Sequence, residues 1–475
     1  MEKQLRDYQV TNSELGVNIL LDFMIVYFAM QVRTGKTATA LNTAYLYGAK
    51  RVLFCTKKKA IKSIEDDYNA FGFNNKFQLT IINNESIHKI EETNFDLVIM
   101  DEAHRFGSFP KPSEGAKNFK LKYGNLPIIF LSGTPHPESY SQVYHQFWVS
   151  NNSPFKHYKN FYNWFSGMGF VKCEFDLGYG IVGNYTNNKE IIYKYYATIK
   201  RKVSKENPNY LLLLADIHER QEKDIERMQQ ANEKMDTMLN KYFVKFSQIE
   251  AGFTSEVKEH VLTVKMKPIT YSLIDRISKD RVIEGKEETI LADTAVKLMG
   301  KIHQLCSGTI KFEKKIVIDD NQNVTELPAK SKIIDYSKAE YIKEFFKEYK
   351  IGIFYKFKEE LNLLKSVFQD ELCTDLDTFN TTNKNIALQV ISGREGISLK
   401  EADYLVFFNI DFSAISYFQA KDRLTTMERK TNDVYWVFAE GGIEEKIYKT
   451  VMGKKDYTLS KFVKDYGIKT PNKIN

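Results

Sequence analysis

The stretch VYFAMQVRTGKT, residues 26–37, decides how the first part of this chain folds. Residues 26–30 are apolar and include β-branched and aromatic side chains, which is typical of a strand covered on both faces. Residues 38–47 favour a helix, so the polar residues between the two segments form a turn from strand to helix. A Gly-Lys-Thr tripeptide in that turn predicts a phosphate-binding loop, because loop N–H groups and a helix N-terminus together attract anions.

The loop carries the side chains that such a site uses. Lys36 is placed to reach the β- and γ-phosphates of a nucleoside triphosphate, and the Thr37 hydroxyl is placed to bind Mg²⁺. The usual first glycine of this loop falls at Met30, so the pattern is incomplete. Taken alone, the tripeptide also fits an accidental match.

A second polar motif, Asp101-Glu102-Ala103-His104, follows the apolar run 97–100. In parallel α/β sheets the binding crevice lies at the carboxyl ends of the strands, so this motif is predicted to lie beside the phosphate loop. There Asp101 is predicted to hold Mg²⁺ and Glu102 to orient or deprotonate the attacking water. A charged turn after a strand is the simpler interpretation, but it leaves the matching strand-end positions of the two motifs unexplained.

Apolar runs alternate with helix-length polar segments in two parts of the chain, and this alternation predicts parallel α/β sheets. We expect strands at residues 26–30, 52–55, 80–82, 97–100 and 128–131, and again at 351–355, 386–390, 404–408 and 434–438. The expected domains are 1–150, an α/β lobe with the phosphate loop; 151–325, a mixed, mainly helical insert and linker; and 326–475, a second α/β lobe with a C-terminal helical tail.

The insert is expected to contain a long helix or helical arm between residues 216 and 250. Apolar side chains recur there at helical spacing: Ile225, Met228, Met235, Leu239, Tyr242, Phe246 and Ile249. A stripe packed against a core is favoured over a partner-binding face. A turn is expected at residues 319–323, on the way into the second lobe.

Length and composition bound the class of protein. The chain has 475 residues, about three domains' worth, and its 43% apolar and 27% charged residues exclude wholesale disorder. A net charge of +7 suits contact with a polyanion but equally a solvated basic surface. The four cysteines have no metal-ligand spacing, and the N-terminus has no signal-peptide layout. We therefore expect no membrane partner and a place in the cytoplasm of a bacterium or a phage-infected cell.

The order of the motifs resembles one known family over almost the whole chain. GKT at 35–37, DEAH at 101–104 and SGTP at 132–135 are similar to the helicase-type ATPases of superfamily two, in particular the Swi/Snf-type branch with its compact bacteriophage members. LRDYQ at 5–9, RTGKT at 33–37, HQLCSG at 303–308 and GIEEKI at 442–447 resemble further segments of that branch. The resemblance implies an α/β fold with two RecA-like parallel-sheet lobes and a mainly helical insert between them.

The resemblance also assigns roles in the first lobe. It assigns adenine recognition to Gln9, and ATP binding to Arg33, Thr34, Gly35, Lys36 and Thr37. It assigns Mg²⁺ binding to Thr37 and Asp101, and activation of the attacking water to Glu102. It assigns coupling between the ATP state and the bound nucleic-acid strand to His104, Ser132 and Thr134. Residues 53–57 match a segment that contacts the nucleic-acid backbone. Nucleic-acid binding is therefore expected of Lys57 and Lys58, in a basic cluster with Lys59 and Lys62, although a solvated helix start explains each lysine as well.

In the second lobe the same resemblance assigns Lys356 and Arg394 to nucleic-acid binding and Gly396 to coupling. Gln419 and Arg423 match the start of a QAxDRxxR motif whose glutamine and arginines face the γ-phosphate across the cleft between the lobes. The second arginine of that motif is Thr426 here, so Arg429, Lys430 or Arg423 alone must supply its charge.

The resemblance implies an ATP-dependent DNA translocase or helicase that uses ATP and Mg²⁺ and binds single- or double-stranded DNA largely without regard to sequence. Two alternatives stay open. An RNA-directed helicase of the same superfamily would share every catalytic residue. A catalytically weak ATP-binding clamp or scaffold would follow if Thr426 removes an essential charge. A restriction-type motor subunit is disfavoured, because no nuclease carboxylate motif is visible.

The departure at Thr426 leads to a first prediction. If Arg429 supplies the missing charge, Arg429→Ala will lower steady-state ATP turnover by at least about 10³-fold, the lower bound for an arginine finger. Phosphate release measured with saturating nucleic acid checks this, and Lys430→Ala tests the competing candidate in the same assay. Equal turnover of Arg429→Ala and the unaltered chain would show that Arg429 does not have this role.

Overall fold

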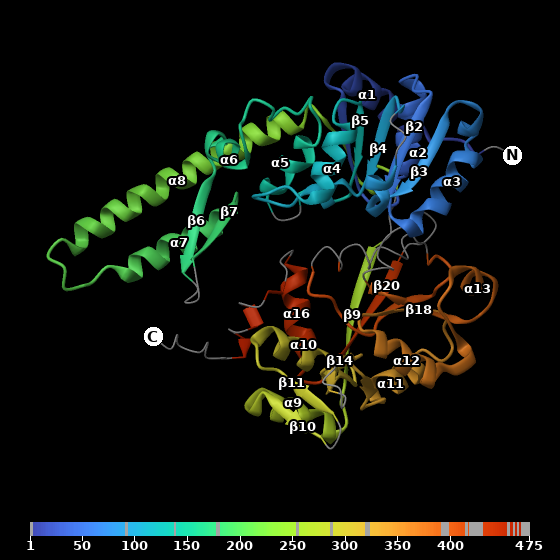
Figure 1. The fold of residues 1–475 in the computed structure, drawn as a ribbon, viewed down its shortest axis with the longest axis vertical. Helices are drawn as coiled ribbons and strands as arrows, with labels where there is room; N and C mark the ends of the chain where they lie inside the picture. The colour runs from blue at the N-terminus through green and yellow to red at the C-terminus, as the bar shows by residue number, and fades with distance from the viewer. Residues whose placement is uncertain are drawn as a thin grey trace. The chain divides into compact units, whose positions relative to one another are not determined.

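The computed structural model describes residues 3–466, apart from 91–93, 137–138, 177–180, 253–255, 286–287, 319–323, 391–398, 414–416, 418–430, 454–456, 459–460 and 463–464. The chain divides into two compact units, Met1–Gly252 and Phe253–Pro471, which are drawn in Figure 1. The range expected for an insert, 151–325, contributes residues to both units. The turn expected at 319–323 lies outside the described residues.

Unit 1 is built on a parallel six-stranded sheet. The strand order is β3-β2-β4-β5-β1-β8, and every described neighbour pair is parallel. The strands are β1 (Ile25–Met30), β2 (Arg51–Thr56), β3 (Gln78–Asn83), β4 (Leu97–Asp101), β5 (Ile128–Leu131) and β8 (Phe243–Phe246).

Helices cover both faces of this sheet, which explains why its strands are apolar throughout rather than alternating. Successive residues of β1 point to opposite faces: Tyr27 packs in one cluster, and Val26 and Phe28 pack in the other. The covering helices are α1 (Asp7–Phe23), α2 (Lys36–Leu46) and α3 (Ile61–Ala70) on one face, and α4 (Glu114–Tyr123) and α5 (Ser141–Trp148) on the other.

An arm extends from the sheet of unit 1, as Figure 1 shows. After α6 (Phe161–Met168), the chain forms the antiparallel hairpin of β6 (Val171–Asp176) and β7 (Ile181–Thr186), and then α7 (Lys189–Lys202) and α8 (Tyr210–Leu239). Met235 and Leu239, near the end of α8, pack in the core of unit 1. Ile217, Ile225 and Met228 pack instead in a separate cluster within the arm.

The helix expected between residues 216 and 250 is present, but its predicted end is wrong. α8 ends at Leu239, and Phe246, counted among the helical positions, ends strand β8. β8 pairs with β1 in parallel register, Tyr27 opposite Phe243 and Met30 opposite Phe246. Pairing with a strand far away in the sequence overrides the local helical spacing here.

Unit 2 also has a parallel six-stranded sheet, with the order β17-β18-β16-β19-β20-β9. Its last member, β9, comes from the start of the unit. The strands are β9 (Glu256–Val264), β16 (Ile351–Tyr355), β17 (Leu372–Cys373), β18 (Asn385–Gln389), β19 (Tyr404–Phe407) and β20 (Thr431–Ala439).

Two hydrophobic clusters again cover the two faces of the sheet. Side chains of α10 (Ala295–Cys306) and α16 (Ile443–Met452) pack in one, and those of α11 (Ser337–Phe345) and α12 (Lys358–Phe368) in the other. The remaining elements are α9 (Pro268–Asp280), α13 (Leu376–Thr381), and the antiparallel pairs β10 (Val282–Glu284) with β11 (Thr289–Leu291), β12 (Thr309–Lys311) with β15 (Ser331–Ile333), and β13 (Lys315–Ile318) with β14 (Val324–Leu327).

The predicted α/β fold class with two parallel sheets is confirmed. In the part of the chain that the structure describes, no helix is long and apolar enough to cross a lipid bilayer.

A fully buried ion pair joins two helices of unit 2. Lys338 Nζ, on α11, lies 2.6 Å from Glu444 Oε1, in the first turn of α16, and neither side chain is exposed. Burial raises the pKa of Glu444, and the Lys338 ammonium counteracts this effect. Removal of one partner from such a pair leaves an uncompensated buried charge.

We expect Lys338→Met to lower the free energy of unfolding by about 3–5 kcal/mol, and Lys338→Met/Glu444→Leu to recover most of that loss. Urea unfolding at pH 7.5 checks both. The control is Lys449→Met, which removes an exposed pair of the same helix (Lys449 Nζ to Glu445 Oε2, 3.8 Å) and should change stability by less than about 0.5 kcal/mol. Equal loss in the single and double variants would contradict the prediction.

Candidate functional site

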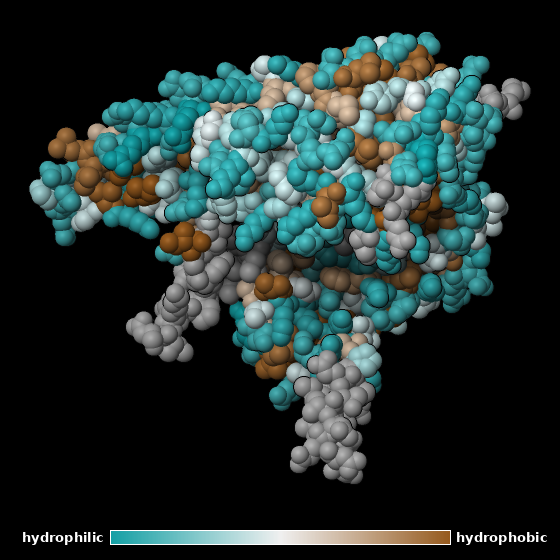
Figure 2. Space-filling model, turned by 45° about the horizontal axis from the view of Figure 1, so that its top comes forward, coloured by the Kyte–Doolittle hydropathy of each residue, from teal (hydrophilic) through white to brown (hydrophobic). Residues whose placement is uncertain are grey.

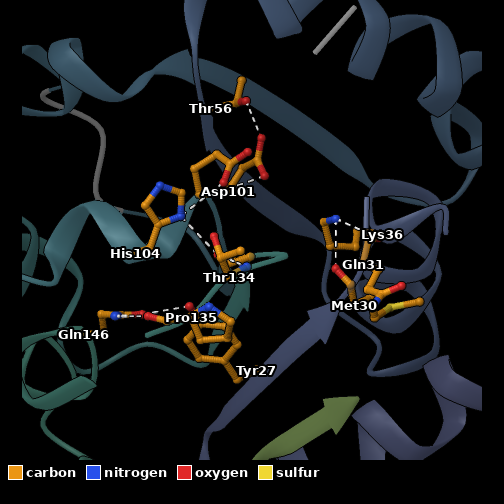
Figure 3. Close-up of polar contacts among 12 residues, drawn as sticks. Tyr27, Met30, Gln31, Lys36, Thr56, Asp101, His104, Thr134, Pro135 and Gln146 are labelled. Carbon is orange, nitrogen blue, oxygen red and sulfur yellow. Dashed lines mark hydrogen bonds and ion pairs between the residues drawn. The ribbon is translucent and has the colours of Figure 1, made fainter. Parts of the chain in front are cut away.

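The parallel register of unit 1 brings the sequence motifs to one edge of the sheet. Cys55 lies opposite Met100 and Asp101 opposite Leu131, so β2, β4 and β5 end at the same level. β1 lies beside β5, with Phe28 opposite Leu131. The residues at or just after these ends are those of the phosphate loop, Thr56, the DEAH motif and the Ser132 loop, and Figure 3 shows several of them together.

The phosphate loop requires a glycine at its end. Gly35 has φ +79° and is the N-cap of α2, a left-handed conformation that favours glycine. A Cβ on this residue would overlap Nε2 of Gln9. The Gln9 side chain is buried; its Oε1 accepts a hydrogen bond from Arg6 N (2.9 Å), and its Nε2 donates to the Gly35 carbonyl (3.4 Å). Gln9 therefore joins α1 to the phosphate loop.

Lys36 begins α2 and turns back over the loop. Its Nζ donates to the carbonyl oxygens of Met30 (3.0 Å) and Gln31 (3.1 Å), and its charge acts on both carboxylates of the DEAH motif. Thr34 is buried and its hydroxyl donates to the Gln31 carbonyl (2.8 Å), whereas Thr37 is half-buried. Arg33 has φ +63°.

A distant residue also holds this loop. Gln248, just after β8, donates from its backbone N–H to Oε1 of Gln31 (2.7 Å) and from its side-chain amide to the Val32 carbonyl (3.0 Å). The Gln31 N–H donates to the Phe246 carbonyl (2.9 Å). The pairing of β8 with β1 thus fixes the loop backbone from the other side.

Asp101 ends β4 in a half-buried position. Its Oδ2 accepts a hydrogen bond from the Thr56 hydroxyl (2.8 Å), and its Oδ1 accepts one from the Glu102 N–H (3.0 Å). Burial, followed by the charge of Glu102, raises the pKa of Asp101 to about 6, although Thr56 and Lys36 act in the opposite direction. The carboxylate is therefore ionised at neutral pH at an energetic cost.

Glu102 has φ +53° and ψ +49°, a left-handed conformation that is unfavourable for a residue with a side chain. Burial raises the pKa of Glu102, but His104, Lys36 and Lys57 outweigh burial and lower it overall. His104 Nδ1 lies 3.2 Å from Glu102 Oε2 and 3.0 Å from the Ser132 hydroxyl. Glu102 Oε2 is buried and has no hydrogen-bond partner among the described residues.

The loop after β5 connects these carboxylates to the rest of the unit. The Ser132 hydroxyl accepts a hydrogen bond from the Thr134 N–H (3.1 Å), and the buried Thr134 hydroxyl has no hydrogen-bond partner among the residues that are described. Beyond it, Gln146 donates to the Pro135 carbonyl (2.7 Å) and accepts from the Tyr27 hydroxyl (2.7 Å). His104, Ser132 and Thr134 thus lie together beside Glu102, and Figure 3 shows His104 and Thr134 near Asp101.

The lysines after β2 divide into two groups. Lys57 is half-buried, and its charge lowers the pKa of Glu102, so it belongs to the site itself. Lys58, Lys59 and Lys62 are exposed and form a basic surface at the start of α3.

The predicted site residues of the second lobe belong to unit 2. Lys356, after β16, is largely buried; its Nζ lies 2.9 Å from Asp411 Oδ1 and 3.6 Å from the centre of the Phe412 ring. The assignment of Lys356 to nucleic-acid binding stays a prediction. To bind a phosphate, Lys356 would have to contact it in addition to Asp411 or instead of Asp411. Five further predicted residues lie outside the described residues: Arg394, Gly396, Gln419, Arg423 and Arg429.

Several residues of the site were not among the predicted ones. Thr56 carried a signal, because it is the polar end of an otherwise apolar strand at the expected edge of the sheet. No signal in the sequence marked Tyr27, Gln146 or Gln248, because their roles depend on contacts between distant segments.

The residues present fit a nucleotide and a divalent cation. The loop that ends at Gly35, at the start of α2, and the Lys36 ammonium group are suited to binding phosphates. Two adjacent half-buried carboxylates that are both ionised call for a cation, and Glu102 Oε2 accepts no hydrogen bond from a described residue. No cluster of three His, Cys, Asp or Glu side chains able to hold a metal occurs within the described ranges, but Mg²⁺ is usually held by one or two carboxylates together with substrate phosphates.

No protein-family model matches this chain, and no curated protein sequence matches it. Among solved structures, the SWI2/SNF2 ATPase core of Sulfolobus solfataricus in complex with dsDNA is similar. The two chains are 13% identical, the match covers 99% of this chain and 96% of that one, and the TM-score is 0.36. At these values the likeness assigns no role to any residue, and the site stands on the geometry of this chain.

The raised pKa of Asp101 leads to a prediction about stability. Because the native carboxyl group keeps its proton up to about pH 6, whereas the unfolded one loses it near 3.8, Asp101 lowers the stability of the fold as the pH rises between these values, and the full loss persists above pH 6. Asp101→Asn should therefore raise the free energy of unfolding at pH 7.5 by about 1–3 kcal/mol.

Thermal unfolding of both chains at pH 7.5 and pH 5 measures this effect. The advantage of Asp101→Asn should shrink at pH 5, where native Asp101 is already protonated. Asp96→Asn is the control, since Asp96 also accepts backbone hydrogen bonds in this unit. A variant no more stable than the unaltered chain at pH 7.5 would contradict the prediction.

Proposed function

We propose that this chain is a nucleic-acid-stimulated ATPase that uses ATP and Mg²⁺ to move along DNA. The observation that carries the proposal is the convergence of Lys36, Asp101 and Glu102 at one edge of a parallel sheet, with the Lys36 charge acting on both carboxylates. A cation from the loop and two carboxylates from the neighbouring motif are the groups that phosphoryl transfer from a nucleotide requires. The order of the sequence motifs supports the same reaction.

The residues of unit 1 divide the work as follows. The loop N–H groups and Lys36 bind the phosphates and neutralise charge that develops on the transferred phosphoryl group. Asp101 and Thr37 would hold Mg²⁺, which supplies further neutralisation when bound. The Thr56 hydroxyl orients Asp101, because it donates a hydrogen bond to one carboxylate oxygen.

Glu102 would position the attacking water and accept its proton. The left-handed backbone of Glu102 and the nearby His104 ring fix the direction of its carboxylate. His104 also contacts the Ser132 hydroxyl, so a movement of Glu102 is passed to the Ser132 loop. We propose that this contact couples hydrolysis to the grip on nucleic acid.

Binding of nucleic acid itself is assigned to exposed lysines after β2, Lys58 first among them. Contacts from lysine to phosphate are independent of sequence and weaken as salt rises. For unit 2 the proposal rests on sequence resemblance: Gln419, Arg423 and Arg429 would act on the γ-phosphate, Lys356 and Arg394 on nucleic acid, and Gly396 in coupling. The Swi/Snf-like form of those motifs favours DNA over RNA.

Lys36→Ala and Glu102→Gln should each lower nucleic-acid-stimulated ATP hydrolysis by about 10²–10³-fold, because each removes a charge that acts on the transition state. Glu102→Gln should still bind ATP, whereas Lys36→Ala should bind it more weakly. Steady-state phosphate release and binding of a fluorescent ATP analogue separate the two effects. Lys111→Ala, an exposed lysine outside the basic surface after β2, is the control.

The same assay, titrated with single-stranded DNA, duplex DNA and RNA, identifies the polymer. Stimulation by RNA alone would replace the DNA translocase with the RNA-directed alternative. Binding of ATP without turnover under every condition would support the clamp instead.

A further inference from the structure

The tip of the arm, residues 200–214, exposes apolar side chains that the fold of the arm does not use. Leu211 is 77% exposed and Leu212 is 71% exposed, in the first turn of a 30-residue helix. Figure 2 shows hydrophobic surface gathered at the end of the arm. A contiguous exposed apolar patch rimmed by polar residues is typical of an interaction site.

The leucines are exposed because α8 is longer than the helix beside it. The Tyr196 hydroxyl donates to Asp224 (2.7 Å) and Lys200 Nζ donates to Gln221 (2.9 Å), so the last turn of α7 lies level with Gln221. From there α8 continues to Tyr210, about 16 Å at 1.5 Å per residue. The projecting part ends in the apolar turn.

The charge at this tip is positive and unpaired. Arg201, Lys202 and Lys205 are exposed and make no ion pair with any described residue, and Glu206 is the one acidic residue in the sequence 200–214. The charges farther along α8 instead pair with one another: Arg220 with Asp216 (2.7 Å), His218 with Glu222 (4.0 Å), and Lys223 with Glu219. The tip therefore suits a polyanion that also offers an apolar face.

The root of the arm is joined to the candidate site. The Tyr140 hydroxyl donates to Asp236 on α8 (2.6 Å), and the Tyr140 N–H donates to Asn187 Oδ1 (3.2 Å), just before α7. Tyr140 precedes α5 and follows the Ser132 loop, which contacts His104. A load on the tip would thus act on the loop beside Glu102.

We propose that the arm tip binds a nucleic-acid fork, with Arg201, Lys202 and Lys205 on the phosphates and Leu211 and Leu212 against the exposed face of the last base pair. This inference rests on the proposed function, which supplies the polymer. A fork combines phosphates with an uncovered base face, and apolar wedges beside cations unstack bases in this way. An anionic membrane fits less well, because an interfacial helix needs an apolar face along its length, and α8 becomes charged from Asp216 onward.

Two sets of substitutions in the full-length chain test the proposal. Leu211→Ser/Leu212→Ser removes the wedge, and Arg201→Gln/Lys202→Gln/Lys205→Gln removes the charge. Matched controls are Leu121→Ser, 86% exposed on α4, and Lys111→Gln/Lys117→Gln/Lys156→Gln, three exposed lysines elsewhere in unit 1. Within the described ranges, Lys117 is the one altered residue with an ion pair, and that pair with Glu114 is exposed, so folding should be unaffected.

Binding to labelled forks of DNA and of RNA, to blunt duplex and to single strands is measured by fluorescence anisotropy without ATP. The charge variant should bind the fork about tenfold more weakly, and the slope of log affinity against log salt should flatten by about 2–3. The leucine variant should keep the same slope of log affinity against log salt but lose its preference for the fork. It should also lose the fluorescence change of a 2-aminopurine base placed in the last base pair of the fork, which reports unstacking of that pair. The control variants should match the unaltered chain within about twofold.

Fork binding and base unstacking that are unchanged in both arm variants would overturn the inference. A change confined to self-association in sedimentation, or to binding of an acidic peptide, would overturn it in favour of a protein partner. ATP hydrolysis on single strands should stay within about twofold in the arm variants. If the unaltered chain shows no stimulated hydrolysis, the proposed function fails, while the fork measurements still decide the role of the arm tip.

Discussion

Parallel pairing of β4 with β2 and β5 is the constraint on which the candidate site depends. This register places Asp101 where it accepts a hydrogen bond from Thr56, and Glu102 and His104 where His104 contacts Ser132. A slip of one residue would turn every side chain of β4 to the opposite face of the sheet. Apolar packing on both faces excludes that slip, because it would exchange the residues of two well-filled clusters.

Several features of the candidate site lower the stability of the fold. The site holds two adjacent half-buried carboxylates, a glutamate in left-handed backbone conformation, and buried polar atoms of Glu102 and Thr134 that make no hydrogen bond with a described residue. The hydrophobic clusters around the sheet offset these costs. Such a concentration of unfavourable features at one edge of an otherwise regular sheet is typical of a functional site, because a bound cation and phosphates would satisfy the same groups.

The arm is not an appendage to this arrangement. The chain leaves the core through α6, runs out along α7 and returns along α8 into β8. β8 then pairs with β1, and Gln248 after it holds Gln31 and Val32 of the phosphate loop. The return of the arm thus completes the backbone support of the loop, while Asp236 near its root holds the residue that follows the Ser132 loop.

The α/β class and the strands that carry the motifs were predictable from the sequence, and Lys36, Asp101 and Glu102 could be proposed from it, because strand periodicity and short polar motifs are local properties. Only the tertiary structure decided that a helix expected to reach residue 250 stops at Leu239, since β8 gains its pairing from a strand about 215 residues earlier. It also decided the roles of Thr56 and Gln248 and the burial of Lys356 against Asp411. These features depend on contacts between segments distant in sequence, which no local pattern encodes.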